Sequence, residues 1–391
     1  MKIIFYFGQI LLNKINHLII RKTLTNLQPL PNQNLRNMKK KYLVRLLLFF
    51  ISVSAAAQKD QIKAAQNELN NGNPQAALST LKACEYLITN AKDQDRSDFF
   101  NLKGKAFTGL ANKNIETAKN LSLAVSAYEE LIASEVDSGN LKYAVQAKTA
   151  IKEIKDNLEK SANEDSNVNK YADCANKMYY LYQMDKKDTL KLYYAASNFM
   201  NAKEYDSALK NFEELKSLNF TGKGIQYFAT NKKSKIEELF ASANHRDSNI
   251  KAGTHEIPRN VMAPSKKIDV YRSLAQIYTE KGNTDNAENY YKKIIDLNPK
   301  YIDAYINMAY LKLDKRKALT DEISNLGTSA KDMKIYEELK AKKDLVIKSA
   351  VSYLEKGNTI EPKNIEISKM LLNLYRALDM TNEYNALKAK I

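Results

Sequence analysis

Residues 268–301 constrain the fold of this chain more than any other stretch. Their apolar residues recur every three or four positions, which is the period of an amphipathic helix. A glycine divides the pattern into two segments, and a proline ends the second one because proline cannot continue a helix. The stretch therefore predicts two short helices joined by a tight turn. The positions that carry the pattern are Tyr271, Leu274, Ala275, Tyr278, Gly282, Ala287, Tyr291, Ile294 and Pro299.

This spacing resembles the tetratricopeptide repeat, a helix pair of about 34 residues that stacks into solenoids. Other segments between residues 61 and 391 follow the same pattern, most clearly at Leu192, Ala195, Ala196, Phe199, Tyr205, Ala208, Phe212 and Leu215. The resemblance implies an all-α, right-handed helical solenoid of about six pairs. Residues 227–258 and 325–344 also look like parts of exported bacterial repeat proteins that have no assigned activity.

The helical pattern stops in residues 224–267. Two strand-like runs, residues 226–230 and 236–240, flank a polar turn at residues 231–235. Runs of this length around a polar turn are typical of a β-hairpin. We therefore expect a small β-hairpin insert around residues 224–245.

The rest of this insert predicts a short helix and a connector. Ser242 is a candidate N-cap for a helix that ends near Gly253. Pro258 and Pro264 then favour an irregular connection, and the insert is expected to act as a hinge. The predicted organisation is an N-terminal arm at residues 58–222, the insert at 223–267 and a C-terminal arm at 268–391.

The C-terminal arm contains a second long interruption at residues 314–345. Apolar residues keep the helical period there, so we expect two extended helices that project beyond an ordinary repeat. A helix at residues 367–378 and a short polar one ending at Ile391 are expected to cap the array.

Residues 38–57 have the three-part pattern of a secretory signal peptide: a basic start, an apolar core and an alanine-rich cleavage site. Cleavage would leave Gln58 as the first residue of an exported protein in the periplasm or cell envelope of a Gram-negative bacterium. An uncleaved N-terminal anchor is the alternative. Residues 1–37 are either an over-extended gene start or a genuine membrane-anchoring leader. Apart from this N-terminal region, we expect the protein to contact a membrane only through a partner.

The net charge of +16 argues less for nucleic-acid binding than it first suggests. The first 57 residues hold nine Lys or Arg and no acidic residue, which leaves 52 basic and 45 acidic residues, a net +7, in the rest. Such a charge is ordinary for a soluble surface. We therefore expect no nucleic-acid partner.

The residues needed for catalysis are sparse. No metal-binding spacing, glycine-rich phosphate loop or nucleophile elbow occurs, so we expect no enzyme activity, no cofactor and no metal. His245, Asp247, His255 and Glu256 are the only candidates for a reactive site, and a structural role is favoured for them. Cys84 and Cys174 lie two repeats apart, which favours two buried free thiols over a disulfide.

In this family the concave surface is lined by one stripe of each first helix, because residues three or four apart share a helix face. Rigid tyrosines mixed with polar groups suit an extended peptide or partner helix. The residues that the stripe predicts as a partner-binding groove are Tyr193, Ser197, Asp269, Arg272, Ser273, Gln276, Thr279, Asp303, Ile306, Asn307 and Tyr310.

The sequence thus favours a non-enzymatic scaffold that binds a protein or peptide on its concave face. Two alternatives stay open. The chain could belong to an envelope carbohydrate-processing or assembly system with a site in residues 224–267, or it could be a self-associating structural envelope protein. The oligomeric state and the identity of the partner are not determined by the sequence.

Overall fold

A computed structural model describes residues 58–240 and 242–390. The predicted signal peptide at residues 38–57 and the segment before it lie outside the described residues. Within the described part, no helix combines the length and the apolarity needed to cross a membrane.

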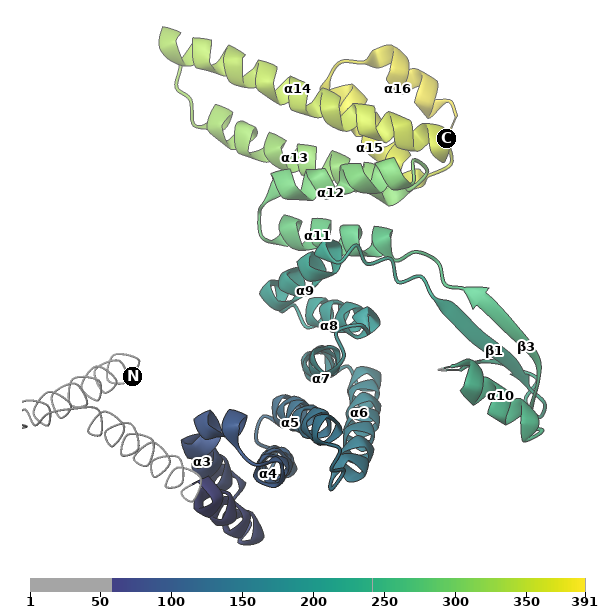
Figure 1. Ribbon diagram of the computed structural model, residues 1–391. Coiled ribbons are helices and arrows are strands. Elements are labelled where there is room, and N and C mark those ends of the chain that lie inside the picture. Colours follow the sequence, from purple (N-terminus) through teal and green to yellow (C-terminus); the bar gives the residue numbers. More distant parts are fainter. Residues whose placement is uncertain (1–57, 241, 391) are drawn as a thin grey trace, which may run out of the picture.

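The described residues form a stack of helix pairs, which confirms the all-α solenoid (Figure 1). Each helix packs on the next, and a short 3-10 helix, η1 (Glu85–Asn90), follows the first pair. The pairs are residues 58–70 with α3 (Pro74–Cys84), α4 (Asp93–Asn112) with α5 (Thr117–Ser138), α6 (Ala144–Asn167) with α7 (Tyr171–Met184), α8 (Thr189–Asn201) with α9 (Tyr205–Ser217), α11 (Lys267–Glu280) with α12 (Thr284–Leu297), α13 (Ile302–Ser324) with α14 (Ala330–Ile360), and α15 (Ile365–Ala377) with α16 (Thr381–Lys388).

The turn between α11 and α12 shows how the sequence sets the pairs. Gly282 takes a left-handed conformation with a φ of 70°, which glycine adopts without steric cost. The side chain of Asn283 then caps α12 by accepting a hydrogen bond from the backbone N–H of Asn286 at 3.2 Å. Ala287 and Ile294 of α12 are fully buried in the stack. The predicted helix–turn–helix at residues 268–301 is therefore formed.

Small residues allow neighbouring helices to approach closely. Ala77, Ala208 and Ala275 are fully buried at such positions. Gly104 marks a close approach of α4 to α5, because an added Cβ there would lie 2.4 Å from Cε1 of Tyr128. Cys84 and Cys174 are buried free thiols, as predicted, and burial raises the pKa of both.

The insert contains the predicted hairpin and a strand that the sequence interpretation missed. Strands β1 (Ile225–Asn231) and β2 (Glu237–Phe240) form the hairpin, and α10 (Ala243–Lys251) follows. Ser242 caps α10 by accepting a hydrogen bond from the backbone N–H of His245 at 3.2 Å. The expected irregular connector is instead strand β3 (His255–Met262), which completes a sheet of order β2-β1-β3.

Strand β3 tolerates Pro258 because it is an edge strand with a bulge. Phe228 pairs with Arg259 and Thr230 with Glu256, so β3 contains one extra residue opposite Ala229. The bulge also holds Ile257 at a φ of 53°, a conformation that a β-branched residue rarely adopts.

The helix stack runs past the insert without a break, and the hinge expected there stays a prediction. Helix α11 packs directly on α9, and one hydrophobic cluster extends from Ala124 to Leu311. The sheet and α10 project sideways from this continuous stack (Figure 1). Beyond it, α13 and α14 extend well past α12, as their sequence period predicted.

Candidate functional site

The first helices of three successive pairs, α11, α13 and α15, surround one hollow of about 480 Å³. Seven of the eleven predicted groove residues line it: Arg272, Gln276, Thr279, Asp303, Ile306, Asn307 and Tyr310. Their spacing along each helix places them on one face because they lie three or four residues apart. The structure therefore brings the C-terminal part of the predicted stripe together.

The other four predicted residues, Asp269, Ser273, Tyr193 and Ser197, do not line this hollow. Asp269 forms an ion pair with Arg272 at 3.3 Å, next to the hollow. Tyr193 is held by its own neighbours: its ring stacks on Phe220 at 5.6 Å, and Nζ of Lys266 lies 5.0 Å from the ring centroid. Burial raises the pKa of Tyr193. The position of Tyr193 therefore indicates a structural role at the base of the insert.

Polar contacts fix the side chains around the hollow. The hydroxyl of Tyr310 donates a hydrogen bond to Oε1 of Glu366 at 2.9 Å, which raises the pKa of Tyr310. Burial opposes the charge on Arg272, but Tyr301 and Asp269 outweigh it and raise the pKa of that guanidinium. The Arg272 guanidinium, the oriented phenol of Tyr310 and the buried apolar side chain of Ile306 thus line the same hollow.

The other lining residues are Glu280, which ends the stripe on α11, and two that sequence reasoning missed, Tyr291 and Glu366. Glu366 occupies the place in α15 that Asp303 occupies in α13, directly after the first helical residue. The stripe would have included it if α15 had been interpreted as a repeat helix and not as a cap. Tyr291 comes from a second helix, α12, so no rule on first helices could have indicated it.

A second hollow, of about 440 Å³, lies on the first helices of the N-terminal pairs and was not predicted. Asp98 of α4 lies at its wall and accepts hydrogen bonds from the Tyr143 hydroxyl at 2.7 Å, from Gln94 at 2.8 Å and from Lys142 at 2.9 Å. Burial alone would raise the pKa of Asp98, but these three donors lower it. A hollow on first helices therefore also occurs at the other end of the described stack.

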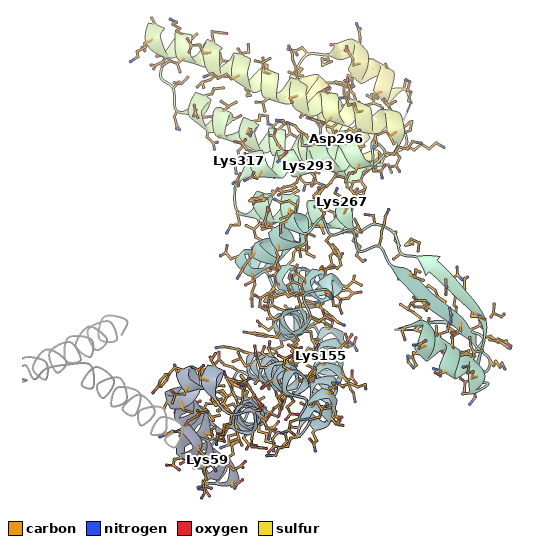
Figure 2. The ribbon with its side chains drawn as sticks, in the orientation of Figure 1. Lys59, Lys155, Lys267, Lys293, Asp296 and Lys317 are labelled. Carbon is orange, nitrogen blue, oxygen red and sulfur yellow. The ribbon has the colours of Figure 1, made fainter. Side chains whose placement is uncertain are left out.

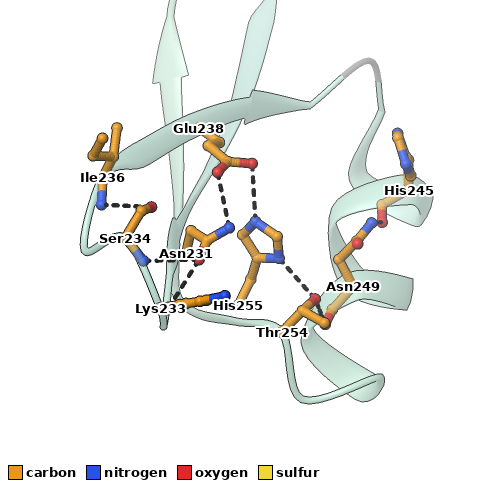
Figure 3. A network of polar contacts seen from close by, with 9 residues as sticks. All are labelled: Asn231, Lys233, Ser234, Ile236, Glu238, His245, Asn249, Thr254 and His255. Atoms are coloured by element: carbon orange, nitrogen blue, oxygen red, sulfur yellow. Dashed lines mark hydrogen bonds and ion pairs between the residues drawn. The ribbon is translucent and has the colours of Figure 1, made fainter.

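The four candidates for chemistry in the insert share no polar contact, although the rings of His245 and His255 both pack edge-on against Phe240, at 5.6 and 5.0 Å. His255 is 6% exposed; its Nε2 lies 3.1 Å from Oε2 of Glu238 and its Nδ1 lies 2.8 Å from the Thr254 hydroxyl. His245 lies apart from it on α10 (Figure 3). Asp247 pairs with the neighbouring Arg246, and Glu256 pairs with Lys235.

This arrangement is that of a structural network. Glu238 also accepts a hydrogen bond from Asn231 at 2.9 Å, so it ties β2 to the ends of both β1 and β3 (Figure 3). Within the described ranges no group of three or more His, Cys, Asp or Glu is placed to hold a metal ion. The four residues do not converge on a common point where a substrate could react.

Comparison with known proteins agrees with the repeat geometry. The family model described as tetratricopeptide repeat matches residues 268–301. These residues form a tetratricopeptide repeat. They build α11 and α12, so the hollow lies on the first helix of the matched repeat and on the first helices of the two helix pairs that follow it.

One curated relative is the "Uncharacterized protein ycf37" of Pyropia yezoensis, which is 31% identical over 111 residues. That match covers 27% of this chain and 55% of the relative, so the chain spans about half of its length. Similar solved structures include a TPR repeats protein from Bacteroides fragilis (17% identity, TM-score 0.31, 70% of this chain and 98% of the other). Another is the C-terminal part of a TPR repeat-containing protein from Cytophaga hutchinsonii (14% identity, TM-score 0.32, 79% and 99%).

Proposed function

We propose that this chain is a non-enzymatic scaffold that binds an extended protein segment in the hollow formed by α11, α13 and α15. The observation that carries the proposal is that seven residues predicted from a periodic stripe line one hollow on three successive first helices. Protein interaction is the general role of tetratricopeptide repeats, which supports the proposal that the hollow binds a protein segment.

The chemistry of the lining suits a peptide. Gln276 and Asn307 offer amide groups that can pair with a peptide backbone, while Tyr310 and Ile306 offer apolar contact. The Tyr310–Glu366 hydrogen bond fixes the phenol before a partner arrives, which lowers the entropy lost on binding.

A site-specific crosslinking experiment tests the proposal. A photoreactive amino acid at Gln276 is expected to form an adduct with a partner in cells, whereas one at Lys292, on the exposed side of α12, is not. The variant Arg272→Ala/Gln276→Ala/Tyr310→Ala should abolish that interaction. The matched variant Asn289→Ala/Lys292→Ala/Asp296→Ala should keep it, since all three residues are exposed. Equal retention by both variants would place the partner elsewhere.

Export to the periplasm or cell envelope is part of the same proposal and is supported by the sequence of residues 38–58 alone. Mass spectrometry of the native N-terminus should find Gln58 as the first residue. A native chain that retains residues 38–57 would contradict cleavage.

A further inference from the structure

The free end of the insert combines positive charge with exposed aliphatic side chains. We call residues 231–237 and 251–257 the insert tip; they lie at the end opposite the point where Lys266 donates a backbone hydrogen bond to Thr221 at 2.7 Å. The tip carries four exposed lysines and two exposed isoleucines, namely Lys232, Lys233, Lys235, Lys251, Ile236 (64% exposed) and Ile257 (69% exposed).

The lysines of the tip are largely without acidic partners. Glu256 pairs with Lys235 at 3.1 Å, and Glu237 is held by Arg259 at 2.6 Å. Lys232, Lys233 and Lys251 form no ion pair with any residue that the structure describes. The tip therefore presents a net positive charge to solvent.

The tip is also held in place. The backbone N–H of Lys232 donates to the carbonyl of Thr254 at 3.0 Å, which joins the two loops. The side chain of Asn231 accepts hydrogen bonds from the backbone N–H groups of Lys233 and Ser234, and the His255–Glu238 contact lies directly behind (Figure 3). The isoleucines are thus presented on an ordered surface, so contact with a partner would cost little conformational entropy.

We propose that the insert tip docks on an anionic lipid surface. The lysines would contact the headgroup phosphates, while Ile236 and Ile257 would enter the boundary between headgroups and acyl chains. Stable association with a membrane surface needs two such signals, one electrostatic and one apolar. The sheet projects away from the helix stack, which leaves its free end clear of the solenoid (Figure 2).

Exposed aliphatic side chains favour lipid over nucleic acid as the partner. Proteins that bind single-stranded nucleic acid present aromatic rings for base stacking. The large exposed apolar side chains of the tip are isoleucines. The tip shares no residue with the hollow on α11, α13 and α15, so docking adds an anchor to the proposed scaffold without depending on it.

Vesicle sedimentation tests the electrostatic half of the proposal. The full chain should bind vesicles made of equal parts phosphatidylglycerol and phosphatidylcholine, and bind pure phosphatidylcholine much more weakly. Each lysine near an anionic surface strengthens binding about fivefold, so Lys232→Gln/Lys233→Gln/Lys251→Gln should weaken it about a hundredfold. The control Lys170→Gln/Lys300→Gln/Lys363→Gln removes the same charge from exposed positions on the solenoid and should change binding little. An equal loss in both variants would overturn the proposal.

Two further measurements test the apolar half. Ile236→Ser/Ile257→Gly should weaken vesicle binding by at least about tenfold, since two aliphatic side chains no longer leave water. An environment-sensitive dye on Ser234→Cys should shift to the blue with anionic vesicles, while the same dye on Ser79→Cys should not. Labelling is selective because Cys84 and Cys174 are buried. Unchanged binding by the isoleucine variant, or no shift at Ser234→Cys, would overturn lipid docking.

Discussion

The carboxylate of Glu135 accepts a hydrogen bond of 2.8 Å from the backbone N–H of Ala144, at the start of α6. The same carboxylate also accepts from the N–H of Tyr143 at 2.9 Å. Glu135 is fully buried on α5, so it satisfies the first free N–H groups of the next helix from inside the stack. A side chain of one helix thereby fixes the start of its neighbour.

Replacing this carboxylate should destabilise the stack. Glu135→Gln removes the charge and one acceptor oxygen, and we expect it to lower the free energy of unfolding by about 1 to 3 kcal/mol. Urea denaturation measures the change. The control Glu130→Gln, at an exposed position of the same helix, should stay within about 0.5 kcal/mol of the parent. A similar loss in both variants would contradict the capping role.

Gly104→Ala should also destabilise the protein, although alanine is the better helix former. The new Cβ would lie 2.4 Å from the Tyr128 ring, so the buried ring or the two helices must shift, at an expected cost of about 1 to 3 kcal/mol. Thermal unfolding measures this cost. In a Tyr128→Ala background the same substitution should become neutral or stabilising, because the clashing ring is absent. A cost that persists there would show that the ring is not its cause.

Stability should fall at alkaline pH. Burial and a hydrogen bond with Glu213 raise the pKa of Tyr290 to about 12, and burial with a hydrogen bond to Glu214 does the same for Tyr182. An unfolded tyrosine titrates near pH 10, so the folded state favours the neutral phenol. This contribution is fully present below about pH 10 and is lost between about pH 10 and 12.

The double variant Tyr182→Phe/Tyr290→Phe tests this dependence. It should lose less stability than the parent protein between about pH 10 and 12, because phenylalanine does not titrate. Chemical denaturation at several pH values gives the slopes. Most lysines titrate alike in both proteins, so the difference in slope reports the two tyrosines together with Lys216, whose pKa the Tyr290 hydroxyl helps to raise. Identical slopes would contradict the assignment.

Ile257→Gly should stabilise the insert. The residue has a φ of 53° and is 69% exposed, so glycine removes backbone strain while little packing is lost. We expect a gain of about 1 kcal/mol in the local opening free energy of the sheet, measured by hydrogen exchange of β3. Ile236→Gly, which removes an exposed isoleucine without relieving a positive φ, is the matched control and should give no gain. If Ile257→Gly gave both a more stable insert and weaker vesicle binding, Ile257 would be retained for docking despite its backbone strain.

The sequence determined the helix pairs, because helical periodicity and turn chemistry are local. Gly282 and Asn283 are sufficient to start α12, and the spacing of Asp303 to Tyr310 is sufficient to place these residues on one helix face. The hairpin of β1 and β2 was predictable for the same reason, since a five-residue turn joins its strands.

Only the tertiary structure decided what depends on distant partners. Strand β3 contains a proline and gains its conformation from pairing with β1, although β2 and α10 separate the two strands along the sequence. Helices α9 and α11 meet across the insert through contacts such as the 3.1 Å hydrogen bond from the Tyr278 hydroxyl to Glu213, 65 positions away. Tyr193 stacks on Phe220 and does not line the hollow, whereas Glu366 does. No periodicity along the chain encodes such neighbours, because they depend on how successive pairs stack.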